Sequence, residues 1–199
     1  MAHDPAYDIP VYARPARRFH WLVAFLILLQ IPIGLYMHYR GNEMPGVNEK
    51  GEPIKGVWDA TTNFLYSSHK TIGLLILAIV VARLIYRLTQ GAPRSDPSLP
   101  AAMTGISHAV HWSIYLLLLA IPIVGYTAVS YGRYLDIFGI PFPPVTVEDK
   151  DAAKEMFELH ETAAWILLAL VSLHISAAIY HKFVRNDRVV ERMLPKRVA

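Results

Sequence analysis

Four apolar stretches, separated by polar segments rich in Pro and Gly, dominate the sequence. They run from Phe19 to Met37, from Thr71 to Leu88, from His111 to Val129 and from Thr162 to Tyr180. Each approaches the roughly 20 residues that an α-helix needs to cross a hydrocarbon layer of about 30 Å. With their flanking residues, the stretches predict transmembrane helices over about 19–38, 67–88, 105–130 and 155–183.

A helical bundle is the simplest arrangement for these stretches. In hydrocarbon every backbone N–H and C=O must find its partner within the protein, and a helix satisfies its own groups. No repeat occurs, and no segment between the stretches is long enough to form a second folded domain. We therefore predict an all-α membrane protein in which residues 1–199 form one domain of four transmembrane helices.

Composition supports a membrane protein and removes several chemistries. Hydrophobic residues make up 54% of the chain and charged residues only 18%, whereas soluble domains carry about 25% charged residues. The chain has no Cys, which excludes disulfide bonds, thiolate-bound zinc, iron–sulfur clusters and covalently attached c-type haem. The net charge of +3 is only a weak argument for nucleic-acid binding, and we predict no such partner.

The distribution of Lys and Arg predicts the orientation of the chain in the membrane. If the N-terminus is cytoplasmic, the inner segments hold twelve of the 19 Lys and Arg residues and five acidic residues. The outer segments then hold seven basic and eleven acidic residues. Because cytoplasmic segments of membrane proteins carry an excess of Lys and Arg, we expect both termini in the cytoplasm.

Histidines mark the ends of the predicted spans. Six of the nine lie there: His20, His69, His108, His111, His160 and His174. An ionisable side chain at membrane depth is costly and is therefore a candidate for function. A single histidine at a span end is more often an ordinary interfacial residue, so the argument depends on how the histidines are paired.

The fourth span carries two histidines on one face. His160 and His174 are 14 residues apart, which is about 21 Å along a helix and within about 40° of the same direction. One imidazole therefore lies near each membrane surface. From the topology, His20 is expected to meet His174 at the inner side, and His69 is expected to meet His160 at the outer side.

Two bis-histidine sites stacked across a bilayer are what a transmembrane electron path needs. A low-spin haem takes two axial ligands from the protein and leaves no open position for oxygen. We therefore predict two non-covalent b haems, the inner one held by His20 and His174 and the outer one by His69 and His160. A single metal ion cannot bridge the ends of span four, because its ligand bonds are only about 2 Å long.

The 14-residue interval recurs at three other positions. Gly34 follows His20, and Gly125 follows His111, by 14 residues. A missing side chain there would let a flat macrocycle approach the backbone, although close helix packing also favours glycine. Arg83 follows His69 at the same interval, at the depth of the inner haem, where its guanidinium is a candidate partner for a propionate.

Three histidines on the inner side are candidates for a quinone site. His181 follows His174 by seven residues, two turns nearer the cytoplasm on the same face, where its proton can pass to a quinone carbonyl. His108 and His111 form an i,i+3 pair at the inner end of span three. Two alternatives stay open. In the first, His181 is an ordinary interfacial residue. In the second, His108 or His111 replaces His20 as a haem ligand.

Short motifs that contain these residues run along the chain. They are Arg18-Phe19-His20-Trp21, His69-Lys70-Thr71-Ile72-Gly73, Val81-Ala82-Arg83-Leu84, His108-Ala109-Val110-His111 with Tyr115, Leu159-His160-Glu161-Thr162 continuing to His174 and His181, and Arg192-Met193-Leu194-Pro195-Lys196. In these motifs, over nearly its whole length, the chain resembles the bacterial cytochrome b561 family. The span-four motif is the most specific part of the resemblance.

The resemblance implies a function and a location. Such proteins are four-helix, di-haem b cytochromes of the bacterial inner membrane that exchange electrons with quinone, and one type is a superoxide oxidase that reduces ubiquinone. The resemblance implies His20, His69, His160 and His174 as the axial ligands of the haem iron. It also implies a quinone-linked oxidoreductase with ubiquinone as its substrate, and it leaves the electron donor open.

Two other functions remain as alternatives. The chain could be the cytochrome b membrane anchor of a periplasmic dehydrogenase or hydrogenase, in which case a large partner would co-purify with it. It could also be a non-redox scaffold or transporter whose histidines serve protonation, in which case the protein would be colourless.

The charge of the outer face bears on the donor. Six acidic residues gather before and at the start of span four: Glu148, Asp149, Asp151, Glu155, Glu158 and Glu161. This charge favours a basic periplasmic cytochrome as the donor and repels superoxide. Superoxide remains a second candidate, because Lys70 and Arg133 form a local positive spot and charges beyond about 8 Å are largely screened.

Overall fold

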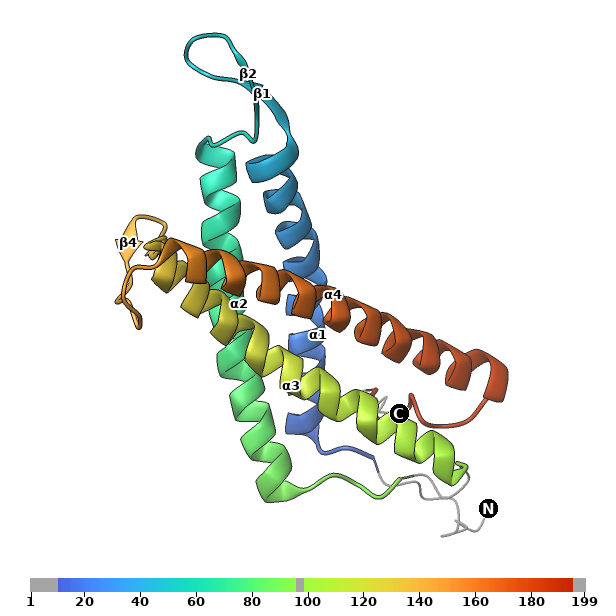
Figure 1. Ribbon diagram of the computed structural model, residues 1–199. Helices are drawn as coiled ribbons and strands as arrows, with labels where there is room; N and C mark the ends of the chain where they lie inside the picture. Colours follow the sequence, from blue (N-terminus) through green and yellow to red (C-terminus); the bar gives the residue numbers. More distant parts are fainter. Residues whose placement is uncertain (1–10, 96–98, 195–199) are drawn as a thin grey trace, which may run out of the picture.

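Four long helices make up the protein in the computed structural model, which describes residues 11–95 and 99–194 (Figure 1). In chain order the helices are α1 (Arg14–His38), α2 (Ala60–Gln90), α3 (Ala101–Gly132) and α4 (Lys150–Tyr180). One π-helical segment, η2 (Tyr39–Glu43), continues α1, and another, η3 (His181–Arg185), continues α4. All four helices are long and apolar enough to cross a membrane, which confirms the prediction of an all-α protein with four spanning helices. Pro195 and Lys196 of the last motif lie outside the described residues.

Every helix begins before its predicted span, and at α2 and α4 a polar side chain caps that beginning. The Asp59 carboxylate accepts the Thr62 N–H at 2.8 Å and so begins α2 well before residue 67. Asp149 begins α4 by accepting the N–H groups of the two residues that follow Lys150, each at 3.0 Å. Gly91, with a φ of 73°, ends α2. Such caps satisfy backbone groups that the helix itself leaves unpaired.

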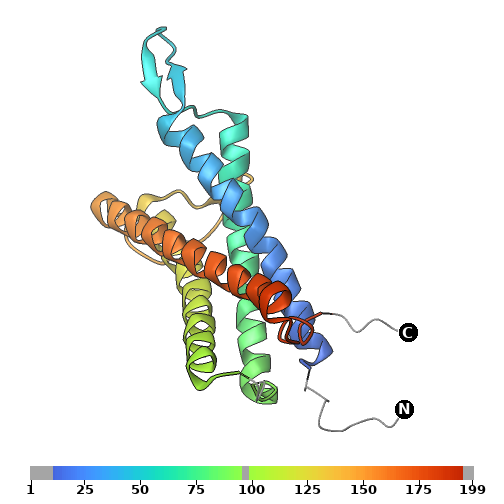
Figure 2. The ribbon, with the colours of Figure 1, turned by 90° about the vertical axis from the view of Figure 1, so that its right-hand side faces the viewer.

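The helices pack as two pairs. α1 lies along α2, and α3 lies along α4, while α2 also contacts α3. Figures 1 and 2 show the second pair crossing the first. The apolar core lies where the pairs meet and consists of Val23, Leu26, Ile27, Ile76, Val80, Tyr115, Leu118 and Leu167. Burial of these side chains is what brings the histidine-bearing faces of the helices together.

Two small hairpins, which the sequence pattern did not predict, lie at one end of the bundle. Strands β1 (Pro45–Val47) and β2 (Pro53–Lys55) pair antiparallel, as do β3 (Asp136–Ile137) and β4 (Ile140–Pro141). The β1–β2 hairpin extends past the ends of α1 and α2 (Figure 2). We call this end of the bundle the outer end, following the predicted orientation.

Both described chain ends meet at the opposite end, which we call the inner end. The Tyr12 N–H donates to the Arg192 carbonyl at 3.2 Å, and the Trp21 indole N–H donates to the Met193 carbonyl at 2.9 Å. The segment that follows η3 therefore folds back onto the start of α1. The two ends of the described chain, at residues 11 and 194, lie on the same side of the bundle, as an even number of spans requires.

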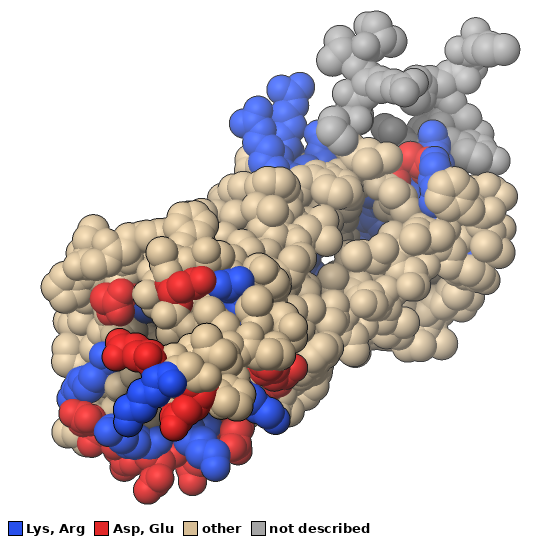
Figure 3. Space-filling model, turned by 90° about the horizontal axis from the view of Figure 1, so that it is seen from above, with Lys and Arg blue, Asp and Glu red and all other residues tan. Residues whose placement is uncertain are grey.

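Charged side chains lie mainly at the two ends of the molecule. Seen from above, the surface between the ends is almost free of charge, as a protein in hydrocarbon requires (Figure 3). At the end that carries most of the acidic residues, Lys and Arg are interspersed among Asp and Glu (Figure 3). The outer face is therefore a mixed surface and not a uniformly acidic one.

An ion pair between a buried arginine and an exposed aspartate closes the outer end between α1 and α2. The Arg40 side chain, with Arg40 only 8% exposed, donates to Asp59 at 2.7 Å and to the Thr62 hydroxyl at 3.0 Å. The hydrogen bond from the Thr62 N–H, and then the Arg40 guanidinium, hold the pKa of Asp59 below its ordinary value of 3.8. A carboxylate stabilised in this way stabilises the fold as long as it stays ionised.

Asp59→Asn is expected to lower the thermal unfolding midpoint at pH 7, because the amide keeps the helix cap but loses the ion pair with Arg40. The contribution of the carboxylate is complete above the ordinary pKa of 3.8 and is lost as the pH falls through the lower folded value. The gap between wild type and variant should therefore close as the pH falls from 3.8 through the lower folded pKa. Asp149→Asn, at the start of α4, is the matched control, and an equal effect at both caps would contradict the role of Arg40.

Candidate functional site

The inner pair of histidines joins the two helix pairs. His20, in the second turn of α1, faces His174 of α4, with ring centres 6.1 Å apart and planes at 80°. Both side chains are partly buried. The packing of the helix pairs thus brings together two residues that are 154 positions apart, as the topology argument predicts.

The outer pair lies between α2 and the outer half of α4. The rings of His69 and His160 have centres 6.0 Å apart and planes at 72°. His160 and His174 lie on one uninterrupted helix, so the two pairs are separated by about 21 Å along α4. Two similar sites are therefore stacked along the bundle, one toward each end.

The spacing within each pair fits two axial ligands of one iron. Each iron–nitrogen bond is about 2 Å long, and a ring centre lies about 1.1 Å behind its nitrogen, so two opposed imidazoles have centres about 6 Å apart. His111 of α3 also approaches His174, but at 5.2 Å between ring centres. That spacing is shorter than a shared iron requires, so geometry favours His20 over His111.

Two histidines are the whole protein contribution at each site. Across residues 11–95 and 99–194, no cluster of three or more His, Cys, Asp or Glu side chains is placed to hold a metal ion. A bare zinc site needs at least three protein ligands, whereas haem iron already has four porphyrin nitrogens and needs only two. The donor set therefore fits haem better than a bare metal ion.

The ring nitrogens of the outer pair are suited to bind iron. His160 Nδ1 lies 3.0 Å from the Ile121 carbonyl. Nδ1–H donates in this bond, which leaves the lone pair on Nε2 for a metal. His69 Nδ1 is buried and has no hydrogen-bond partner among the described residues. Buried polar atoms are normally satisfied, so an unsatisfied imidazole nitrogen fits a residue that binds a further group.

Two glycines make room for the rings of the outer pair. A Cβ on Gly125 would lie 2.9 Å from both Cε1 and Nδ1 of His160, and a Cβ on Gly34 would lie 3.1 Å from Cε1 of His69. The 14-residue spacing predicts these glycines at this depth, and there we expected the missing side chains to make room for the macrocycle. The structure shows that the space is needed first by the imidazoles.

Arg83 lies at the depth of the inner pair, as its spacing predicts. Its Nη1 is 3.3 Å from His20 Nδ1, and its Nε donates to the Tyr115 hydroxyl at 2.8 Å. The guanidinium also lies over the Tyr115 ring, 5.3 Å from its centre. Tyr115 therefore fixes a cation beside the inner pair, where an anionic group such as a propionate would be held.

The three candidate quinone residues are not brought into one cluster. His111 Nδ1 lies 3.2 Å from the Ser107 hydroxyl, one turn earlier on α3. His108 is exposed. His181, at the start of η3, lies 2.6 Å from an Asp187 carboxylate oxygen through Nδ1. Of the three, His181 alone has a charged partner.

Lys70 is less available to an incoming anion than its place beside His69 suggests. Its ammonium group donates to the carbonyls of Tyr134 and Asp136 and lies 3.7 Å from the Asp136 carboxylate, and its side chain is 17% exposed. Lys70 thus holds the β3–β4 hairpin over the outer end of α2. The adjacent carboxylate offsets part of its charge.

Two residues near these sites were missed by the sequence argument. Gln30 of α1 donates to the His69 carbonyl at 3.0 Å, and its own amide oxygen is buried without a partner among the described residues. A lone polar residue inside the first apolar stretch was a signal that could have found it. Asp187 has no comparable signal, because it lies in a polar tail and reaches His181 only through a turn.

Comparisons with known proteins identify the family of the chain. The sequence pattern of the family described as prokaryotic cytochrome b561 matches residues 11–196. The chain is 29% identical over 180 residues to cytochrome b561 homolog 2 of Escherichia coli, covering 89% of this chain and 88% of that protein. It is 31% identical over 131 residues to the probable superoxide oxidase CybB of Yersinia pestis, covering 65% and 74%. It is 25% identical over 192 residues to cytochrome b562 of Cereibacter sphaeroides, covering 94% and 98%.

Proposed function

Because this chain belongs to the prokaryotic cytochrome b561 family, we propose that it carries electrons across a bacterial inner membrane, between an outer donor and membrane quinone. Membership of the family implies b-type haem. When bound, the haem iron alternates between ferric and ferrous states and passes one electron at a time. The observation that carries the proposal is the presence of two histidine pairs, with ring centres 6.1 and 6.0 Å apart, stacked along α4.

In this proposal each pair holds one of two b haems. His20 and His174 hold the inner haem, and His69 and His160 hold the outer haem. The Ile121 carbonyl orients His160. Arg83, fixed by Tyr115, neutralises a propionate of the inner haem, since a guanidinium pairs well with a carboxylate.

The proposed orientation places both termini in the cytoplasm. Both described chain ends lie at the inner end, and the Lys and Arg excess belongs to the same end. The outer histidine pair and the hairpins then face the periplasm. Electrons enter from a periplasmic donor at the outer pair and leave at the inner pair.

Ubiquinone is the proposed acceptor, at the inner end. His181 lies two helical turns beyond His174 and is the first candidate to contact the quinone, because it has an acidic partner. His111, which contacts the His174 ring at 5.2 Å, and the exposed His108 are further candidates. The proposed activity is that of a quinone-linked oxidoreductase.

A reduced-minus-oxidised visible spectrum of the purified protein tests the proposal, followed by addition of a short-chain ubiquinone. We expect b-type haem bands that disappear when the quinone is added. A colourless protein would indicate a scaffold or transporter. Haem bands that persist after quinone addition would contradict the proposed acceptor.

Two donors fit the outer face, and each has an observation in its favour. The acidic residues at the start of α4 favour a basic protein such as a soluble cytochrome, because complementary charge accelerates the encounter of redox partners. The pairing of Lys70 with Asp136 weakens the positive spot that would guide an anion. Similarity to a probable superoxide oxidase favours superoxide. We propose the basic protein as the first candidate and superoxide as the second.

Stopped-flow reduction of the oxidised protein separates the two donors. If the donor is a basic cytochrome, haem reduction is fast, slows as salt is added, and superoxide reduces the haem only slowly. Reduction by superoxide near the diffusion limit that slows in Lys70→Glu would contradict the protein donor. Lys154→Glu is the control, because it makes the same charge change at a side chain that is 78% exposed on the outer part of α4.

A further inference from the structure

A partly buried acid–imidazole dyad lies at the inner end, outside the two histidine pairs. His181 Nδ1 is 2.6 Å from Asp187 Oδ2, and the two side chains are only 14% and 13% exposed. His181 is seven residues beyond His174, on the same face of the helix. The dyad therefore lies between the inner pair and the aqueous phase.

The turn after η3 fixes the Asp187 carboxylate. Asn186 takes the left-handed conformation, with a φ of 53°, and the Asp187 N–H donates to the His181 carbonyl at 3.2 Å. The other carboxylate oxygen accepts the Val189 N–H at 3.2 Å, and Arg185 Nε donates to Oδ2 at 3.1 Å. The backbone hydrogen bond to the His181 carbonyl thus closes the turn. The turn does not need the side-chain bond between Asp187 and the imidazole.

Asp187 remains ionised in this position. Burial by itself would raise its pKa, but the hydrogen bonds from His181, the Val189 N–H and Arg185 outweigh burial and hold the pKa below its ordinary value. A carboxylate at Nδ1 requires that nitrogen to carry the proton. It also stabilises the imidazolium that forms when Nε2 takes up a second proton.

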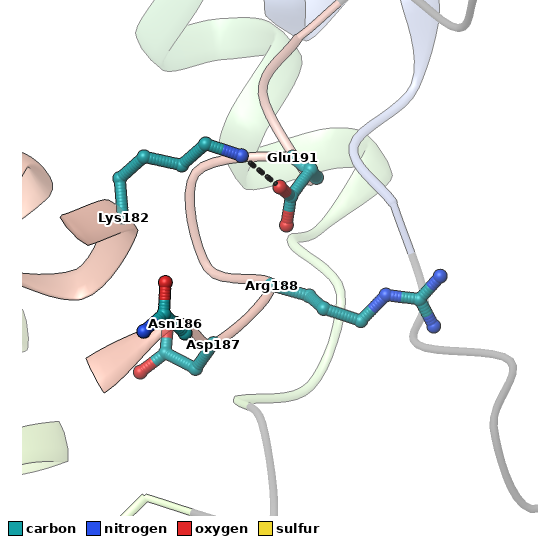
Figure 4. A pocket seen from close by; sticks show the side chains of 5 residues that line it. All are labelled: Lys182, Asn186, Asp187, Arg188 and Glu191. Carbon is teal, nitrogen blue, oxygen red and sulfur yellow. Dashed lines mark hydrogen bonds and ion pairs between the residues drawn. The ribbon is translucent and has the colours of Figure 1, made fainter. Parts of the chain in front are cut away.

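A cavity of about 280 Å³, lined in part by Asp187, lies beside the dyad. Its lining consists of Lys182, Asn186, Asp187, Arg188 and Glu191 (Figure 4). Figure 4 shows the Lys182 ammonium pointing toward Glu191, at 2.5 Å, on one side of the cavity, while the Arg188 side chain extends away. Asp187 is thus the lining residue that connects this cavity to the imidazole of His181.

Other charged groups near the dyad are already engaged. Lys182 pairs with Glu191. Arg185 contacts both Asp187 and the Met103 sulfur of α3, the latter at 3.7 Å. From α1, Arg17 donates to the Leu194 carbonyl at 2.5 Å. Arg188 also lines the cavity.

We propose that His181 donates the protons that reduce quinone at the inner end, and that Asp187 positions its imidazole and stabilises the protonated form. This inference rests on the proposed quinone reduction. A quinone becomes a quinol by taking up two electrons and two protons. The electrons arrive singly from the reduced inner haem, which is oxidised. Each proton passes from Nε2–H of the imidazolium to a quinone oxygen, and water in the cavity protonates the ring again.

The pH dependence of haem reoxidation by a short-chain ubiquinone tests the relay. His181→Gln is expected to slow reoxidation by about 100-fold, since a positioned general acid contributes 10²–10⁴-fold. Asp187→Asn keeps the turn but removes the negative charge beside the imidazole, so the pH profile of reoxidation should differ from that of the wild type. Glu191→Gln, which lines the same cavity without contacting the dyad, should leave rate and profile unchanged.

A second readout does not depend on haem or quinone. In ¹⁵N-histidine-labelled wild type, the nitrogen signals that disappear in His181→Gln should show a ring protonated at Nδ1, and Asp187→Asn should shift those signals. The relay would be overturned if Asp187→Asn kept both the wild-type nitrogen signals of His181 and the wild-type pH profile of reoxidation. If ubiquinone does not reoxidise the haem even in the wild type, both the proposed function and the relay are wrong. If the wild type is reoxidised normally and His181→Gln and Asp187→Asn have the wild-type rate and pH profile, only the relay is wrong.

Discussion

His174→Ala and His20→Ala are each expected to lose the inner haem and to keep the outer one, so that haem content falls from two per chain to one. The reason is that each proposed haem site offers only two histidines, with ring centres 6.1 Å apart at the inner pair, and a haem held from one side would lose half of its protein coordination. His69→Ala and His160→Ala should each lose the other haem. The spectra of the two variants within a pair should match each other and differ from those of the other pair.

His111→Ala is the informative control for this pairing. His111 also contacts His174, at 5.2 Å, but its spacing does not fit a shared iron. The variant should therefore keep both haems. If His20→Ala keeps both haems and His111→Ala loses one, the inner ligand is His111 and the pairing argued from the ring spacing is wrong.

Gly125→Leu is expected to remove the outer haem, although glycine has no side chain to bind it. A Cβ at this position would already lie 2.9 Å from the His160 ring, closer than non-bonded carbon atoms approach. His160 cannot move aside and still keep both its bond to the Ile121 carbonyl and its partner His69. Haem content and the reduced-minus-oxidised spectrum should show one haem, with the features of the inner site.

Gly105→Leu on the same helix is the matched control, because a Cβ there meets nothing within 4 Å. It should keep both haems. The smaller change Gly125→Ala should weaken outer haem binding less than Leu does. Full haem content in Gly125→Leu would show that the His160 ring can rotate away freely, and that the glycine is needed for helix packing alone.

The helices were predictable from sequence because one strong physical rule determines them. A chain in hydrocarbon must satisfy its own backbone, and the apolar runs from Phe19 and from Thr162 have the length that this rule requires. Their ends were not predictable from the same rule. Asp59 and Asp149 extend α2 and α4 outside the apolar region through side-chain caps, and such caps leave no trace in a hydropathy pattern.

The candidate site was likewise predictable from the sequence only in part. The 14-residue interval between His160 and His174 follows from helix geometry, so the sequence predicted two depths and the partner at each. Contacts that depend on tertiary packing were not visible. The Ile121 carbonyl under His160 and the Asp136 partner of Lys70 come from other elements, and Asp187 reaches His181 only because Asn186 adopts a left-handed turn.

Electron transfer across a sealed membrane tests the central claim most directly. In vesicles that contain the protein and trapped ferricyanide, an external reductant should reduce the ferricyanide much faster than in protein-free vesicles. His20→Ala and His69→Ala should each abolish this difference, because a path with two haems in series fails when either is missing. Wild-type vesicles that reduce ferricyanide no faster than empty ones, or a His69→Ala protein that retains the wild-type rate, would contradict a path through two stacked haems.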